Sequence, residues 1–285
     1  MSIFILRYME GIKLKVGITN KRLWSNFIKV ISAVAGVLSI VLAFIDVEQR
    51  PRIVIALCSI ILLVIIFIVM FIFANKQTIL KMKINGTNVN IIFGDIFAQN
   101  GIKVIAFNEY FDTKVDDKII SATSLNGIYI NQHSPGADAI DTIINTEEHL
   151  KKKILKKNVS RKYGGKTTLY TLGTICPIDD YFLLALTHFD EDNKAYLSLE
   201  DYIPCLLHMW DELDIYYAGK PIVITLLGSG ITRFNNSEIT PQELLKYIVL
   251  TFKASKVKFN NTSSLTIVLS ERVRDEINLY DIEKD

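Results

Sequence analysis

The sequence is poor in cysteine and shows no pattern of metal ligands. Its three cysteines, Cys58, Cys176 and Cys205, do not have the paired spacing of a zinc site or a disulfide framework. They fit a reducing compartment such as the cytoplasm. The histidines also lack the spacing of metal ligands, so we expect no metal and no resident cofactor. They are His133, His149, His188 and His208.

Charge is missing from one long apolar run. Residues 53–74 contain no Asp, Glu, Lys or Arg over 22 positions. At about 1.5 Å rise per residue, a helix of this length spans roughly 33 Å, enough to cross a hydrocarbon core of about 30 Å. Residues 27–45 form a second apolar run, in which only Lys29 is charged, near enough to the end to snorkel. Neither run has the polar stripe of a soluble helix, which predicts a transmembrane hairpin.

Basic residues flank both ends of this hairpin. Five precede the first run and three follow the second, whereas the short turn between them has two basic and two acidic residues. This distribution places both termini on the cytoplasmic side of the inner membrane. A cleaved signal peptide is the alternative for the first run, but the second run follows too closely. The expected organisation is a cytoplasmic segment (1–23), a hairpin (24–75) and a cytoplasmic domain (76–285).

The domain after the hairpin has no net positive charge. Residues 76–285 hold 24 Lys/Arg and 27 Asp/Glu, so no broad basic surface for nucleic acid is expected. No ionisable residue lies in the middle of either run, which argues against a charge-selective channel. Small residues recur at helical spacing in the first run. They could form a face for self-association of the helices, or they could reflect the composition of the run by chance. They are Ser32, Gly36, Ser39 and Ala43.

Strand and helix patterns alternate through residues 76–285. A hairpin is predicted at Asn85-Gly86, a helix over 137–157, a helix from the cap Ser198 to about Tyr217, and a helix opened by a capping box at Thr240. Further β-rich runs complete the pattern, which is typical of an α/β domain with a central mixed sheet flanked by helices. The expected strands are 81–84, 89–93, 103–107, 168–175, 181–187, 221–227 and 265–269.

Three loops that follow strands could carry the function. The strongest is 226–234, in which glycines let backbone N–H groups approach a phosphate, although a plain tight turn is the alternative. The second is Gly94-Asp95-Ile96, where a lone aspartate is more often a turn former. The third is Ala106-Phe107-Asn108, whose amide could bind a ribose hydroxyl or simply form a turn.

The order and spacing of these loops resemble the macro domain, a fold that binds ADP-ribose. The resemblance covers roughly residues 79–270. It implies that Asp95 accepts the adenine amino group and that Asn108 lies near the distal ribose. The glycine-rich loop would wrap the diphosphate, with an aromatic residue beside the ribose. The implied ligand-binding residues are Asp95, Ile96, Asn108, Leu227, Gly228, Ser229, Gly230, Ile231, Thr232 and Phe234.

The sequence departs from the macro pattern after the second loop. The usual Asn-Ala-Ala-Asn is Ile-Ala-Phe-Asn over residues 105–108, and the glycine-rich continuation is replaced by Glu109–Thr113. Macro enzymes need that continuation to position water, so binding without hydrolysis, and no catalytic residue, is expected. Three carboxylates in the following loop are interpreted as solvated rather than catalytic. These are Asp112, Asp116 and Asp117.

Residues 165–174 and 181–187 resemble a bacterial macro subfamily of antiphage defence. Two N-terminal membrane helices fused to such a domain resemble the membrane effectors of type II Thoeris systems. The resemblance implies a partner TIR-domain protein that converts NAD into an ADP-ribose-derived signal. It also implies that the effector binds this signal, forms a homo-oligomer and damages the inner membrane in abortive infection.

Two other functions remain open from the sequence. A membrane-anchored ADP-ribosyl hydrolase would use Asn108 and a loop acid, and a membrane scaffold would hold a vestigial pocket. The basic tract Lys151–Lys157, with Arg161, Lys162 and Lys166, is interpreted as a solvated surface at a helix end. Contact of this tract with the anionic inner leaflet, or with an anionic group of the ligand, is the alternative.

Overall fold

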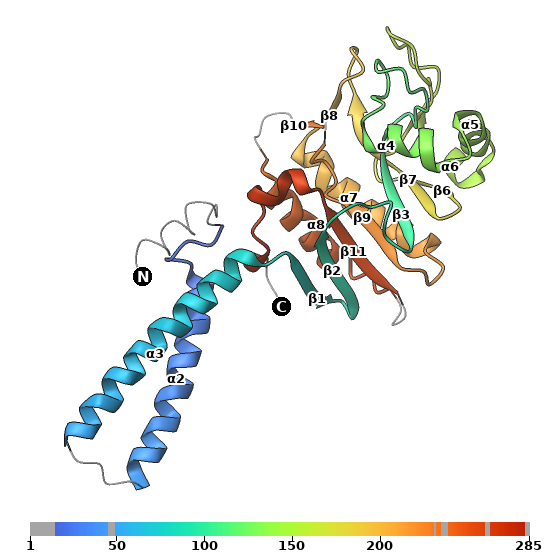
Figure 1. The fold of residues 1–285 in the computed structure, drawn as a ribbon. Helices are drawn as coiled ribbons and strands as arrows, with labels where there is room; N and C mark the ends of the chain where they lie inside the picture. Colours follow the sequence, from blue (N-terminus) through green and yellow to red (C-terminus); the bar gives the residue numbers. More distant parts are fainter. Residues whose placement is uncertain (1–14, 45–48, 231, 235–238, 260–262, 283–285) are drawn as a thin grey trace. The chain divides into compact units, whose positions relative to one another are not determined.

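The computed structural model describes residues 15–44, 49–230, 232–234, 239–259 and 263–282. Within them the chain forms two compact units, one of residues 15–78 with 277–282 and one of residues 79–276. The first unit holds two long helices and the C-terminal segment. The second holds a sheet with helices on both faces (Figure 1).

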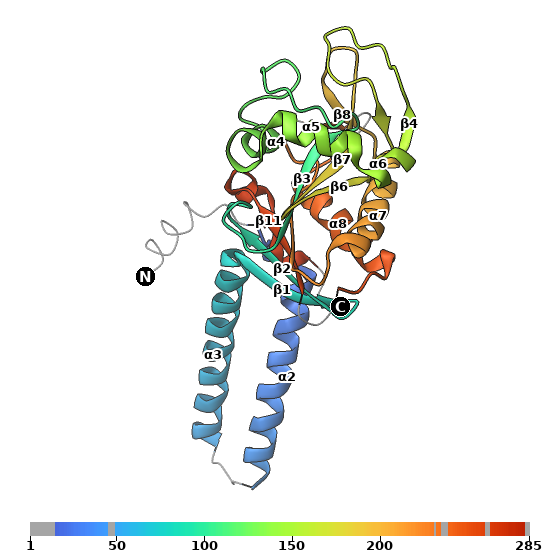
Figure 2. The same cartoon turned by 90° about the vertical axis from the view of Figure 1, so that its right-hand side faces the viewer.

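The first unit is a helical hairpin (Figure 2). Helix α2 spans Lys21–Phe44 and helix α3 spans Gln49–Lys76, and both are long and apolar enough to cross a bilayer. The predicted run at 53–74 therefore lies inside α3, and the run at 27–45 lies inside α2 up to Phe44, since Ile45 is outside the described residues. Helix α3 begins four residues before its apolar run, because Pro51 fits the first turn, where its missing N–H costs no helical hydrogen bond.

A small cluster closes the base of this hairpin. Val16, Leu23, Phe71 and Ala74 are buried together, and the partly buried Tyr280 packs against them. The Asn75 side chain accepts hydrogen bonds from the backbone N–H groups of Lys15 (2.8 Å) and Val16 (2.9 Å). The short C-terminal helix η3 (Leu279–Asp281) belongs to this unit rather than to the sheet.

In the second unit, nine strands of the described residues form one sheet in the order β1-β2-β11-β9-β3-β7-β8-β10, with β6 paired to β7. The neighbours β2, β11, β9, β3 and β7 run parallel, whereas β1, β6 and β8 pair antiparallel. The mixed α/β sheet is the predicted one. The strands are β1 (Ile79–Ile84), β2 (Thr87–Phe93), β3 (Ile102–Asn108), β6 (Ile175–Ile178), β7 (Tyr181–Phe189), β8 (Ala195–Leu197), β9 (Ile222–Thr225), β10 (Arg233–Phe234) and β11 (Ser264–Leu269).

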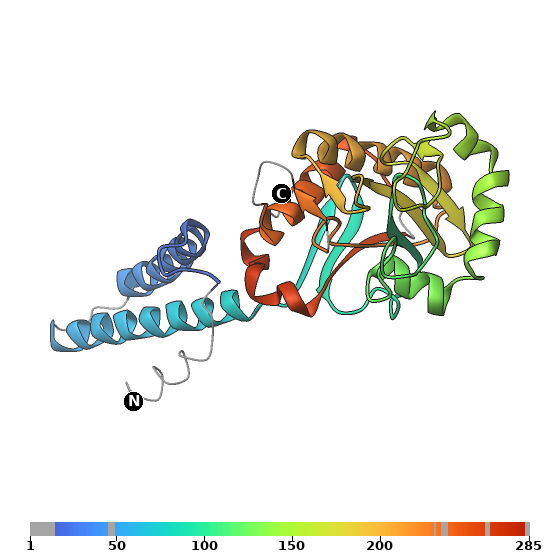
Figure 3. The same ribbon diagram turned by 90° about the horizontal axis from the view of Figure 1, so that it is seen from above.

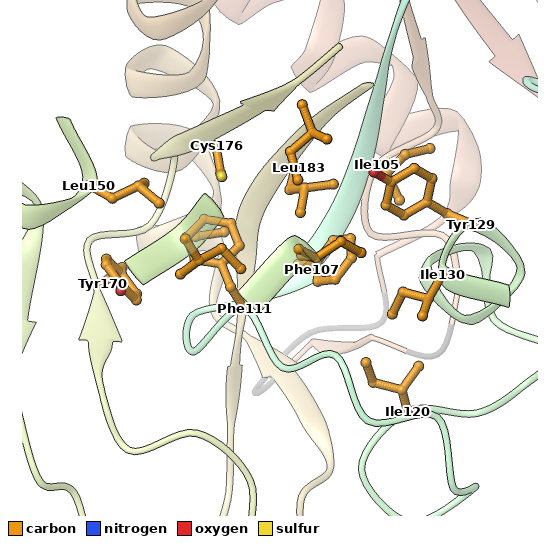
Figure 4. Packing of buried hydrophobic residues seen from close by; sticks show 14 of the residues in the cluster. Ile105, Phe107, Phe111, Ile120, Tyr129, Ile130, Leu150, Tyr170, Cys176 and Leu183 are labelled. Carbon is orange, nitrogen blue, oxygen red and sulfur yellow. The ribbon is translucent and has the colours of Figure 1, made fainter. Parts of the chain in front are cut away.

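Helices flank the central strands, which explains why most positions of β3 and β7 are buried. One cluster joins Ile105, Phe107 and Leu183 to side chains of the segments outside the sheet (Figure 4). Figure 3 shows the flanking helices from above. They are α4 (Leu125–Ile128), η1 (Tyr129–His133), α5 (Ala137–Thr146), α6 (Glu148–Lys152), α7 (Leu199–Tyr216) and α8 (Pro241–Ser255), with η2 (Glu271–Glu276) after β11.

Several predicted elements are confirmed. The β1–β2 turn has Asn85 and Gly86 both at positive φ, as a two-residue hairpin requires. Ser198 caps α7, which ends at Tyr216, and Thr240 with Glu243 forms the capping box of α8. The strands expected at 103–107, 181–187 and 265–269 correspond to β3, β7 and β11.

Two expectations are wrong. The helix expected over 137–157 stops at Glu147, whose extended backbone ends α5 and starts α6. Its last residues form β4 (Ile154–Lys156), which pairs antiparallel with β5 (Leu169–Tyr170). The strand expected over 168–175 is interrupted between Tyr170 and Ile175, because Gly173 turns the chain at positive φ. In both places pairing with a distant segment overrides local propensity.

Candidate functional site

The candidate site lies where five parallel strands end. The carboxyl ends of β2, β11, β9, β3 and β7 share one edge of the sheet, since these strands are successive parallel neighbours (Figure 1). Loops at such an edge are the usual ligand-binding elements of open α/β sheets. All three loops singled out in the sequence follow one of these strands.

The glycine-rich loop spans this edge. It leaves β9 after Thr225 and enters β10, which pairs with β8 on the far side of β3 and β7. The loop therefore passes the carboxyl ends of β3 and β7. Gly228 has a φ of 86°, and a Cβ at this position would lie 3.0 Å from the Phe234 ring, so glycine is required.

Hydrogen bonds fix the start of this loop. The Ser229 backbone N–H and hydroxyl both donate to the Leu226 carbonyl oxygen, at 3.1 and 2.6 Å. The buried Tyr202 hydroxyl of α7 donates to the Leu227 carbonyl oxygen at 2.8 Å. Gly230 is exposed and has open space around its Cα. The loop thus combines a rigid start with an open glycine that a ligand can approach.

The far end of the loop carries the predicted aromatic residue. Phe234 is half-buried in β10, and its ring meets Tyr202 edge-on at 5.5 Å. Thr232 is half-buried beside it. Ile231, also predicted to bind the ligand, lies outside the described residues.

Asp95 lies in the loop after β2. Its Oδ1 accepts a hydrogen bond from the Phe97 backbone N–H at 3.0 Å, which makes a local turn, and the side chain is exposed. Its second carboxylate oxygen has room for an external donor such as an exocyclic amine. The neighbouring Ile96 is 3% exposed and packs into the main core, so it holds the loop in place.

Asn108 is buried at the end of β3, and its side chain is engaged inside the protein. Its Oδ1 accepts from the Tyr110 and Asp112 backbone N–H groups at 3.0 and 3.3 Å, and its Nδ2 donates to Asp112 Oδ2 at 3.0 Å. With 2% of its surface exposed, this amide organises the loop that follows β3. Asn108 lies at the sheet edge because β3 ends there, and its contacts are those of a positioning residue; its role beside the distal ribose stays a prediction.

The loop after β3 is held by a buried ion pair that the sequence interpretation missed. Arg161 Nη1 lies 2.6 Å from Asp112 Oδ2, and the two side chains are 6% and 1% exposed. Arg161 also donates to Asn193 Oδ1 at 2.6 Å and lies over the Tyr110 ring at 4.3 Å. The interpretation of Asp112 and Arg161 as solvated is therefore wrong, whereas Asp117 is exposed as expected.

Lys166 also joins this network. Its backbone N–H donates to Asp112 Oδ1 at 2.7 Å, and its ammonium contacts Asp141 and donates to the Phe111 carbonyl oxygen. Burial lowers the pKa of Lys166, and the carboxylates partly oppose this. Phe111 itself has a φ of 49°, uncommon for a bulky residue, and is fully buried. The turn made by glycines in the macro pattern is thus built here from buried bulky and charged side chains.

A second acidic residue follows Asn108 directly. Glu109 is buried, and its Oε2 lies 2.6 Å from His188 Nδ1 at the end of β7. The hydrogen bond to Glu109 raises the pKa of His188, which burial opposes. His188 Nε2 lies 3.7 Å from Asp201 in the first turn of α7. No group of three or more metal-ligating side chains is found in the part of the chain that the structure describes.

Comparisons with known proteins agree with this architecture. The family model of the Thoeris protein ThsA macro domain matches residues 89–270. The Thoeris protein ThsA of Bacillus amyloliquefaciens (strain Y2) is 40% identical over 265 residues, which cover 92% of this chain and 89% of that protein.

Solved macrodomains are more distant. The Oceanobacillus iheyensis macrodomain with ADP is 12% identical with a TM-score of 0.46, covering 70% of this chain and 91% of that one. A variant of the same macrodomain with ADPR is 15% identical with a TM-score of 0.44, covering 72% and 94%.

Proposed function

The chain belongs to the Thoeris ThsA family, and from this premise we propose that it is a signal-gated membrane effector of antiphage defence. Its macro domain binds an ADP-ribose-derived signal, which a partner TIR-domain protein makes from NAD. The ligand-bound protein assembles through its helical hairpin and disrupts the inner membrane. Its role is that of a sensor and effector rather than an enzyme.

One observation carries this proposal. Two loops with complementary chemistry, the carboxylate loop after β2 and the glycine-rich loop after β9, meet the same edge of the sheet, in a chain that also carries two span-length helices. A carboxylate suits an exocyclic amine, and backbone N–H groups of a glycine-rich loop suit a diphosphate. An adenine dinucleotide-like ligand presents both groups.

Each candidate residue then has a distinct role. Asp95 accepts the adenine amino group with its free carboxylate oxygen. The exposed Gly230 offers open backbone to the diphosphate. Gly228 and Ser229 shape the turn before it, because the Ser229 N–H and hydroxyl donate to Leu226. Leu227, Ile231 and Thr232 flank this turn, and Phe234 lines the ribose. Asn108 and Ile96 hold their loops in the binding conformation, because both are buried and engaged within the protein.

Hydrolysis is not part of the proposal. The loop after Asn108 is filled by Phe111 and fastened by the Arg161–Asp112 pair, so its carboxylate is committed to an internal cation. A general base must keep a lone pair within reach of a water at the reacting carbon. Both carboxylate oxygens of Asp112 already accept hydrogen bonds, from Arg161, Asn108 and the Lys166 backbone N–H. Asp112 therefore does not meet this requirement.

The membrane output follows if the ligand binds the assembled state better than the separate chains, since a ligand shifts an equilibrium only by its differential affinity. Ser32, Gly36, Ser39 and Ala43 lie on α2 and are the candidate face for close helix approach. Clustered apolar helices without a charged lining suit disruption of the bilayer better than selective conduction.

Leakage from dye-loaded vesicles tests this function. The full chain is reconstituted and exposed to the small-molecule products of NAD incubated with a TIR-domain protein, with untreated NAD as control. Leakage with the products, absent for Asp95→Ala, supports the proposal. Equal leakage with and without the products contradicts signal gating. Release of free ADP-ribose from an ADP-ribosylated protein by the full chain would favour the hydrolase alternative.

A further inference from the structure

The cytoplasmic end of α2 carries a groove that the proposed signal does not use. It has a volume of about 610 Å³ and is shallow and open to the surface. Six residues of the turn before α2 and of its first turns line it, and they combine two lysines, two hydroxyls and two apolar side chains. They are Thr19, Lys21, Trp24, Ser25, Ile28 and Lys29.

The tryptophan in this groove is fixed in place. The Trp24 indole N–H donates to the Ile18 carbonyl oxygen at 2.8 Å, and its ring contacts Phe27 and Phe67 at 5.8 and 5.1 Å. The side chain nonetheless remains 42% exposed, and Ile28 is 56% exposed. A rigid, half-exposed indole at the end of an apolar helix is typical of the level of lipid headgroups.

The two lysines of the groove have no acidic side chain within ion-pair distance in the described part of the chain. Lys21 and Lys29 are two turns apart, about 12 Å along the axis. Helical side chains lean toward the N-terminus, so the Lys29 stem brings its ammonium back toward Lys21. Both cations can therefore serve one headgroup region.

The adjacent face of the same helix is already occupied. Arg22 Nη1 donates to the carbonyl oxygens of Tyr280 and Ile282, the latter at 2.9 Å, and its guanidinium lies over the Tyr280 ring. Asn26 donates to the Tyr280 hydroxyl at 2.9 Å. The C-terminal segment thus uses the Arg22–Asn26 face, and among the described residues it makes no hydrogen bond or ion pair with Lys21 or Lys29.

We propose that this groove binds the headgroup of an anionic glycerophospholipid. The ammonium groups of Lys21 and Lys29 and the hydroxyls of Thr19 and Ser25 contact the phosphate, and the acyl chains run along Ile28. The inference rests on the proposed membrane insertion of the hairpin. It adds a lipid site on the first turns of α2, whereas the proposed nucleotide-binding loops belong to the other unit. A lipid bound there would anchor α2.

Fluorescence quenching of Trp24 tests this site directly. The full chain is reconstituted in two sets of phosphatidylcholine bilayers. One set contains a small fraction of brominated phosphatidylglycerol, and the other contains the same fraction of brominated phosphatidylcholine. The second tryptophan, Trp210, is fully buried on α7 and supplies a constant background, and Trp24→Phe identifies the quenched signal. We expect the anionic lipid to be enriched at Trp24 roughly fivefold to tenfold.

Variants of the two lysines distinguish a specific lipid-binding site from general electrostatic attraction between the protein and anionic lipids. Lys21→Gln with Lys29→Gln should bring quenching by the anionic lipid down to that by phosphatidylcholine. The control Lys246→Gln with Lys258→Gln, which removes the same charge from exposed positions of the other unit, should leave it unchanged. Equal quenching by both lipids in the unmodified chain would overturn the lipid site while leaving membrane insertion intact. Quenching by neither would overturn membrane insertion and, with it, the lipid site.

Discussion

The Tyr202 hydroxyl donates to the Leu227 carbonyl oxygen at 2.8 Å and so fastens the start of the glycine-rich loop to the first turn of α7. Both residues are buried, at 0% and 1% exposure. The same tyrosine ring supports Phe234 at the other end of the loop. One side chain therefore sets the shape of the proposed diphosphate cradle.

Removal of this hydroxyl should loosen the loop. Tyr202→Phe leaves the buried carbonyl of Leu227 without its donor, so we expect a loss of about 1–2 kcal/mol in unfolding free energy. Affinity for ADP-ribose should fall as well, because the free loop must then be ordered by the ligand. Chemical denaturation and calorimetry measure the two effects. Tyr247→Phe on α8 is the matched control, and an equal effect of both changes would contradict the anchoring role.

The two glycines of the loop should respond differently to alanine. Gly228→Ala forces a side chain into a φ of 86° and against the Phe234 ring, so it should lower the unfolding free energy by about 1–2 kcal/mol. Gly230→Ala meets no atom within 4 Å and should leave the melting temperature unchanged. Thermal denaturation of both variants checks this. The same loss of stability for both would show that the loop is built differently.

The buried ion pair of the loop after β3 should be costly to break. Arg161→Met leaves the Asp112 carboxylate buried without its cation, and we expect a loss of about 3–5 kcal/mol. Lys162→Met provides a neighbouring control, because Lys162 is exposed and lies 3.7 Å from the exposed Asp192. An exposed pair of this kind contributes little. Denaturant titration that gave equal effects for the two variants would refute the network.

A second buried cluster predicts how stability depends on pH. Glu212 on α7 is 2% exposed and lies within 2.9 Å of both His149 Nε2 and Lys153 Nζ. Burial raises the pKa of Glu212, but hydrogen bonds from His208, Lys153 and His149 outweigh it and hold the pKa at about 2. Its stabilising contribution is therefore present above its ordinary pKa of 4.5 and is lost as the pH falls toward 2.

Glu212→Gln isolates this contribution. The variant should be less stable than the unmodified chain at neutral pH, and the gap should narrow between about pH 4.5 and pH 2. Melting temperatures across this range measure the gap. A constant gap would show that Glu212 is not ionised in the folded protein or that its partners do not stabilise the charge.

Local signals in the sequence were sufficient to predict much of the fold. The Asn85-Gly86 turn, the Ser198 cap and the Thr240 capping box depend on residues within a few positions of each other, and all three are present. The apolar runs likewise marked the two long helices, because a charge-free stretch of that length has few alternatives.

The features that could not be predicted from the sequence depend on interactions between residues far apart in the chain. Arg161 and Asp112 are 49 positions apart, and each belongs to a polar stretch that reads as solvated. Tyr202 lies in an amphipathic helix, where a tyrosine suggests only core packing, although its hydroxyl reaches Leu227. The strand β4 pairs with β5 across a gap that no local pattern marks. The ligand-binding roles of Asp95 and the glycine-rich loop stay predictions.

Calorimetric titration of the full chain with ADP-ribose tests the central claim most directly. The account predicts saturable binding at one site per chain without turnover. Asp95→Ala should weaken it at least tenfold, and Gly230→Glu should abolish it without loss of melting temperature, because it places a carboxylate in the proposed diphosphate cradle. An unmodified, folded chain that shows no saturable heat with ADP-ribose would contradict the account.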